Sequence, residues 1–259
     1  MTHVKTITRD HVLEIRISRP EKLNALSPEM YGDIATALGL LDRSPELRVG
    51  LICADGKHFS SGIELDRWAP IFAEAKGFPV PEGGLDPFAL TGKRCSKPLV
   101  IAVQGYCFTW GVELLLTTDI RVAATNSSFA MLEVKRGLYP CGGATLRLPQ
   151  QMGWANAQRH LLTGKAWTAD DAFRTGLIQQ VVDVGSEYDA ALAIAGEIAA
   201  AAPLGVQAVL RSSRLAHTEG ESTAASHLMD DMPNVMHSAD AKEGVASFLE
   251  RRAAHFQGR

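Results

Sequence analysis

The chain of 259 residues has little of what several common protein classes depend on. Its cysteines include no CxxC pair and no His/Cys cluster with zinc-ligand spacing, so the sequence predicts neither a disulfide scaffold nor a metal site. We expect four reduced and mostly buried thiols: Cys53, Cys95, Cys107 and Cys141. HExxH, GxSxG and Walker motifs are missing, as is a GxGxxG after a strand, which disfavours the usual zinc, serine-hydrolase and dinucleotide sites.

Long basic runs and long uninterrupted apolar runs are also missing. The net charge is −3, and no run of lysine or arginine could follow a nucleic-acid backbone, so nucleic acid is not a predicted partner. The two longest apolar stretches, 98–116 and 190–210, each contain a glutamate and Gly or Pro, so neither predicts a membrane span. Charges scattered through residues 1–20 indicate structured chain and not a signal peptide. We therefore expect a cytoplasmic protein without a membrane partner.

What is present is an ordinary globular composition, with 46% hydrophobic and 21% charged residues. Length alone fits two modest domains or one large α/β domain. Alternating apolar residues predict a hairpin over 3–8 and 12–18, and Ser27-Pro28-Glu29 is typical of a helix start. Further strands are predicted over 49–53, 99–103, 120–124 and 178–184. Strand–turn–helix units recur about every 40–50 residues, which favours a winding architecture.

Two regions depart from this pattern. Residues 70–92 are rich in Pro and Gly, which indicates a mobile excursion that forms a lid or pocket wall. From Glu187 to Phe256 the chain is Ala-rich and broken only by Pro203 and by short loops near Gly220 and Ser238, which predicts packed helices. Their apolar surface must be buried against the body of the protein or against another subunit.

Three turns are candidate parts of a functional site. FSSGIEL (59–65) and GYCFTWGVEL (105–114) each place backbone amides at the start of a predicted helix, where they can bind an anionic oxygen. Glu113 stands in an otherwise apolar helix, and Glu133 follows a strand-like segment and precedes the glycine-rich PCGGAT. Each feature alone is equally typical of an ordinary turn or of a solvated or paired acid.

Together these motifs resemble the crotonase superfamily, most closely the enoyl-CoA hydratases. RPEKLNAL (19–26) is similar to the family's RPxxxNAL, and GYCFTWGVEL to GYxxGGGxEL. FAMLE (129–133), with Gly137, Pro140, Gly143 and TLRL (145–148), resembles FxxPExxxGxxPxxGGTxRL. Residues 242–256 are similar to the family's terminal EGxxAFxEKRxxxF. The resemblance extends over nearly the whole chain.

The resemblance implies an α/β fold: one crotonase-type domain over 1–259, with a ββα-spiral core to about 190 and a C-terminal helical trimerisation region over about 191–259. It implies an acyl-CoA substrate and a homotrimer or dimer of trimers, with no cofactor other than the CoA that the substrate carries. The backbone N–H groups of Ile63 and Trp110 correspond to the donors that hold the thioester oxygen. The implied CoA contacts are Lys22, Leu23, Ser61, Ile63, Leu65 and, from a neighbouring subunit, Arg251.

The resemblance implies enoyl-CoA hydration, with Glu113 and Glu133 as acid and base. The presence of both acids favours a hydratase over an isomerase. Other crotonase-type reactions (isomerisation, dehalogenation, thioester hydrolysis) and acyl-CoA binding without turnover are the alternatives. Thr109 and Trp110 replace two glycines of the GGG motif. The indole is expected to redirect the acyl pocket, or else to turn into the core.

Overall fold

A computed structural model describes residues 3–74 and 77–259. Its larger sheet has the strand order β1-β2-β3-β4-β6-β9. The predicted hairpin is present: β1 (Val4–Arg9) and β2 (Val12–Ile17) pair antiparallel, and all other neighbours in this sheet are parallel. The remaining strands are β3 (Val49–Ala54), β4 (Leu99–Val103), β6 (Ile120–Ala124) and β9 (Gln180–Val182). Every residue of β3 and β4 is buried, as expected of parallel strands that are covered on both faces.

A second, three-stranded sheet forms another layer. It contains β5 (Tyr106–Phe108), β7 (Ser128–Ala130) and β8 (Trp167–Thr168), in the order β5-β7-β8. Each strand of the smaller sheet comes after a strand of the larger one, because β5 follows β4 and β7 follows β6. The chain therefore winds repeatedly from one sheet to the other, which confirms the predicted spiral fold. The candidate turn over 105–114 contains β5, which its sequence pattern did not predict. Gly105, at φ +56°, makes the corner, and a Cβ there would lie 2.2 Å from the Lys57 carbonyl oxygen.

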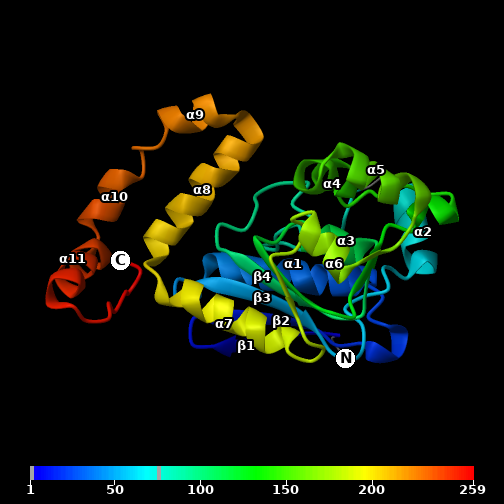
Figure 1. Ribbon diagram of the computed structural model, residues 1–259, viewed down its shortest axis with the longest axis horizontal. Helices are drawn as coiled ribbons and strands as arrows, with labels where there is room; N and C mark the ends of the chain where they lie inside the picture. Colours follow the sequence, from blue (N-terminus) through cyan, green and yellow to red (C-terminus); the bar gives the residue numbers. More distant parts are fainter. Residues whose placement is uncertain (1–2, 75–76) are drawn as a thin grey trace.

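Helices cover both faces of the larger sheet (Figure 1). α1 (Pro28–Arg43) begins as predicted, with the Ser27 hydroxyl accepting from the Met30 N–H, and packs in the main apolar cluster. α7 (Glu187–Ala200) lies on the opposite face, where small residues, Ala191, Ala195 and Ala199, contact β3, β4 and β6 closely.

Short helices surround the junction of the two sheets. They are η1 (Pro20–Lys22), α2 (Leu65–Ala73), α3 (Trp110–Leu115), η2 (Glu133–Arg136), α4 (Ala144–Met152), α5 (Trp154–Thr163) and α6 (Ala169–Arg174). The expected excursion from residue 70 is partly wrong, because Pro70 lies within α2. Asp86 and Phe88 are buried, so the later part of that segment forms a packed wall. Residues 75–76 of the segment lie outside the described residues.

The C-terminal residues 203–259 form a helical arm. It consists of α8 (Pro203–Glu219), α9 (Glu221–Ser226), α10 (Met232–His237) and α11 (Ala239–Glu250), which arch away from the sheets in Figure 1. No residue of α8 or α10 is buried, and Phe248 of α11 is 82% exposed. Among the described residues, no single helix is long and apolar enough to cross a membrane; only α7 and α8 together, which meet at a bend of 107°, reach that length.

Candidate active site

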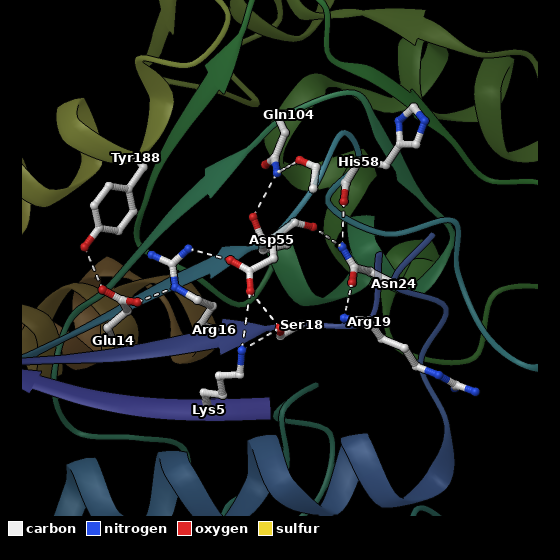
Figure 2. Close-up of polar contacts among 12 residues, drawn as sticks. Lys5, Glu14, Arg16, Ser18, Arg19, Asn24, Asp55, His58, Gln104 and Tyr188 are labelled. Atoms are coloured by element: carbon white, nitrogen blue, oxygen red, sulfur yellow. Dashed lines mark hydrogen bonds and ion pairs between the residues drawn. The ribbon is translucent and has the colours of Figure 1, made fainter. Parts of the chain in front are cut away.

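A buried asparagine holds the first candidate turn in place. Asn24, from the RPEKLNAL run, donates from Nδ2 to the carbonyl oxygens of Asp55 and His58, each at 2.8 Å (Figure 2). The backbone carbonyl of Asn24 accepts from the Ser60 hydroxyl at 2.9 Å. The Asp55 carboxylate accepts hydrogen bonds from the Arg16 guanidinium and the Ser18 hydroxyl. Burial raises the pKa of this carboxyl, but these hydrogen bonds outweigh burial and lower it overall. Asn24 therefore fixes the chain both before the turn, at Asp55 and His58, and within it, at Ser60.

Two amides of this turn, those of Ile63 and Leu65, have no acceptor among the described residues. The Ser61 N–H donates to the Leu23 carbonyl and the Gly62 N–H to the Ser60 hydroxyl, whereas the Ile63 N–H donates to no group among the described residues. Of the free amides expected in this turn, those of Ile63 and Leu65 are unpaired in the described chain, and the resemblance assigns the thioester oxygen to Ile63. Ile63 lines a cavity of about 540 Å³.

The second candidate turn lies directly beside the first. Ser60 pairs with β5: its N–H donates to the Tyr106 carbonyl, and its carbonyl accepts from the Phe108 N–H. α3 begins at Trp110, whose N–H also donates to no group within the described chain. Trp110 lines the same cavity as Ile63. Two unpaired backbone donors from different turns are thus brought to one cavity.

Glu113 lies one turn further along α3 and is fully buried. Its Oε1 accepts from the N–H groups of Gly142 at 2.8 Å and Ala144 at 3.0 Å, and its Oε2 has no partner among the described residues. Burial raises the pKa of Glu113 to about 8; the charge of Glu133 adds to this rise, and the two N–H donors oppose it. A Cβ on Gly142 would lie 2.5 Å from Oε2, so only glycine fits against this carboxyl.

Glu133 lines the cavity at the start of η2. Both of its carboxyl oxygens are shielded from solvent and have no hydrogen-bond partner in the described structure. Burial raises the pKa of Glu133 to about 7. Two carboxyls with raised pKa values, one fixed by backbone donors and one unpaired, can share a proton near neutral pH.

Aromatic side chains form the wall of the cavity on the Trp110 side. The indole of Trp110 is 2% exposed, with its ring centroid 4.4 Å from Trp68, 4.8 Å from Phe88 and 5.4 Å from Phe78. This packing agrees with the expectation that the ring turns into the core, and a redirected acyl pocket stays a prediction. The ring packs into an aromatic cluster, and the same residue borders the cavity.

The predicted CoA-binding residues fall into three groups. Ser61 and Leu65 line the cavity with Ile63. Lys22 and Leu23 lie on the neighbouring turn, joined to Ser61 through the Leu23 carbonyl. Arg251 ends α11 in the helical arm, far from α2 and α3 in Figure 1, so this chain does not bring it to its own cavity.

Comparisons with known proteins identify the family. A family model described as enoyl-CoA hydratase/isomerase matches residues 8–259. Enoyl-CoA hydratase EchA19 of Mycobacterium tuberculosis is 37% identical over 255 residues, covering 97% of this chain and 95% of that protein. The chain belongs to the enoyl-CoA hydratase/isomerase family.

Other members agree with this assignment. Carnitinyl-CoA dehydratase of Salmonella typhi is 34% identical over 257 residues, 96% of this chain and 95% of that protein. The structure of a probable enoyl-CoA hydratase/isomerase from Mycobacterium abscessus matches with a TM-score of 0.96 and 41% identity, covering 99% of both chains. The predicted family and its crotonase-type α/β fold are confirmed.

Several residues at this family site were missed by sequence reasoning. The sequence analysis noted PCGGAT as a glycine-rich turn but not that its amides hold Glu113. Cys141 in that turn lines the cavity, and burial, with the charges of Glu113 and Glu133, raises the pKa of its thiol to about 11. The adjacent glycines were the available signal, because a turn that must approach a carboxyl closely has no room for side chains.

Proposed function

We propose that the protein is an enoyl-CoA hydratase, which adds water across the double bond of a 2-enoyl-CoA thioester. The observation that carries the proposal is that Glu133 lines the same cavity as two unpaired backbone N–H groups, with the buried carboxyl of Glu113 close enough for the charge of Glu133 to raise its pKa. Membership of the enoyl-CoA hydratase/isomerase family supports the CoA thioester as substrate.

The two amides would donate hydrogen bonds to the thioester carbonyl oxygen. When water adds to the β carbon, negative charge develops on the thioester oxygen. The N–H groups of Ile63 and Trp110 are fixed by the turns that carry them, so they stabilise this charge without reorganising. One such donor contributes about a hundredfold to a thousandfold in rate.

The two glutamates would carry out the proton transfers. One carboxylate takes a proton from water as the oxygen bonds to the β carbon, and the other carboxylic acid protonates the α carbon. The raised pKa values, about 8 for Glu113 and about 7 for Glu133, allow one proton on the pair near neutral pH. Since Oε1 of Glu113 accepts two N–H bonds, its proton belongs on Oε2.

Isomerisation and acyl-CoA binding without turnover do not require both carboxyls. Double-bond isomerisation needs one acid to move a proton, and an acyl-CoA-binding protein needs none, so neither explains two buried carboxyls. Two of the relatives, an enoyl-CoA hydratase and a carnitinyl-CoA dehydratase, are named for adding and removing water, which favours hydration over isomerisation or thioester hydrolysis.

Substitution of each acid tests the proposal. We expect Glu113→Gln and Glu133→Gln each to lower hydration of a preferred enoyl-CoA by at least about a hundredfold, with folding and CoA binding retained. The assay follows loss of enoyl absorbance across a panel of enoyl-CoAs, and calorimetry with CoA serves as the binding control. Near-normal hydration by either variant would remove the two-acid assignment, and thermal stabilisation by CoA without any turnover would favour a binding protein.

We also propose a homotrimer or a dimer of trimers, assembled through the helical arm. The exposed apolar residues of the arm, Val209, Met229, Met236, Val245, Phe248 and Leu249, need a covering surface. In such an assembly Arg251 would reach the CoA of a neighbouring subunit, near the Lys22–Leu23 turn. A monomer by light scattering at micromolar concentration would overturn both statements.

A further inference from the structure

Thr109 occupies a backbone conformation that suits glycine. Its φ of +48° and ψ of −110° are strained for any residue with a Cβ, and most of all for a β-branched one. The position is fixed from both sides, since its N–H donates to the Ala130 carbonyl at 2.7 Å and its carbonyl accepts from the Glu113 N–H at 3.0 Å. A threonine here costs stability that a glycine would not.

The hydroxyl of Thr109 adds a second cost. Its Oγ1 is shielded from solvent and has no hydrogen-bond partner among the described residues. A buried hydroxyl without a partner destabilises a fold, because it has lost its hydrogen bonds to water and gained none in return. Packing does not explain it, because valine would fill the same volume without an unpaired polar atom.

The hydroxyl lies close to the turn that carries the Ile63 amide, and Thr109 is the chain neighbour of Trp110. Thr109 directly precedes Trp110, and a Cβ placed on Gly62, the neighbour of Ile63, would lie only 2.2 Å from Thr109 Oγ1. Thr109 also lines the cavity with Ile63 and Trp110. Of the buried unpaired polar side-chain atoms in the described chain, it is the only hydroxyl.

We propose that the Thr109 hydroxyl is a third donor to the substrate's thioester oxygen, acting beside the N–H groups of Ile63 and Trp110. This inference rests on the proposed hydratase function. The hydroxyl gains a partner only when substrate is bound, and the charge that develops on the oxygen during water addition strengthens that hydrogen bond. The strain and the unpaired hydroxyl then serve catalysis, not folding.

The test compares three variants of the full-length protein. T109V removes the hydroxyl with little change of shape, T109S keeps the hydroxyl and removes the methyl group, and T117V is the matched control. Thr117 is a buried threonine in the segment after α3, and its hydroxyl is already paired with the Leu114 carbonyl at 2.7 Å. We expect T109V to lower kcat at least about tenfold with little change in KM, and T109S to restore most of that kcat. T117V should lower the Tm and leave kcat nearly unchanged.

A spectroscopic readout separates this proposal from the hydratase proposal. The absorption of bound 4-dimethylaminocinnamoyl-CoA moves to longer wavelength as donors polarise its carbonyl, whether or not the ligand reacts. The shift should be smaller in T109V than in the wild type and in T109S. If no enoyl-CoA is hydrated, the hydratase proposal fails and this shift still decides the role of Thr109. An unchanged shift and kcat in T109V, or equal losses in T109V and T109S, would overturn the third donor; if T109V does not fold, T109A replaces it.

Discussion

The two buried carboxyls should make the protein less stable as the pH rises, and Glu113→Gln isolates the contribution of one of them. In the unfolded chain Glu113 loses its proton near its ordinary pKa of 4.5, whereas in the folded protein burial raises the pKa to about 8. Between these values the folded state binds more protons than the unfolded state, so the free energy of unfolding falls with increasing pH. Glutamine has no proton to lose, so the variant lacks this contribution to the slope.

The size of the effect follows from the shift. One pKa unit corresponds to about 1.4 kcal/mol, and a rise from 4.5 to about 8 gives an upper value of about 5 kcal/mol above pH 8. We expect E113Q to match the wild type near pH 5 and to be about 3–5 kcal/mol more stable at pH 8.5. For a chain of this size, 1 kcal/mol moves the Tm by roughly 2–4 °C, so the gap in Tm should reach at least about 6 °C.

The measurement is the Tm of both proteins by calorimetry from pH 5 to pH 8.5, at one protein concentration and ionic strength. Glu46→Gln, which replaces an exposed glutamate, is the matched control and should leave the pH dependence unchanged. A Tm difference between E113Q and the wild type that stays constant over this range would refute the reasoning, because it would show that the buried carboxyl does not bind its proton more tightly in the folded state.

Three further substitutions test the packing around the site. Gly142→Ala should lower kcat by more than about tenfold, since its Cβ would lie 2.5 Å from Oε2 of Glu113; steady-state kinetics check this, and an unchanged kcat would contradict it. Asn24→Ala leaves the partly buried carbonyls of Asp55 and His58 without their donor and should lower the free energy of unfolding by about 1–3 kcal/mol. Denaturant unfolding measures this, and wild-type stability would show that the turn holds without Asn24. Trp110→Gly should lower the free energy of unfolding by roughly 3–5 kcal/mol, because the ring packs in the aromatic cluster. Since Trp110 also lines the cavity, the variant should raise activity on long or bulky enoyl chains relative to crotonyl-CoA. Lost stability with an unchanged ratio of long-chain to short-chain activity would exclude a role of Trp110 in the acyl pocket.

Local sequence patterns determined most of the elements of the larger sheet and its helices. The alternation over 12–18 and the Ser27-Pro28 start of α1 depend on neighbouring residues, so they could be recognised before any contact was known. The three-residue strand β5 could not, because so short a segment has no periodicity and exists only through pairing with β7. Pro70 likewise suggested a break, but α2 continues through it to Ala73, with the loss of one hydrogen bond inside the helix.

For the site, the sequence by itself determined which residues carry chemical groups: Glu113, Glu133 and the amides of two glycine-containing turns. The tertiary structure decided which of those groups are free to act. The amides of residues 61–63 look alike in the sequence, yet of these three only the Ile63 N–H lacks an acceptor in the part of the chain that the structure describes, because Leu23 and Ser60 accept from the other two. Likewise, the raised pKa values come from burial and from the proximity of two acids twenty positions apart in the chain. Burial and proximity arise only when the two sheets close around the cavity, so residue types alone could not predict them.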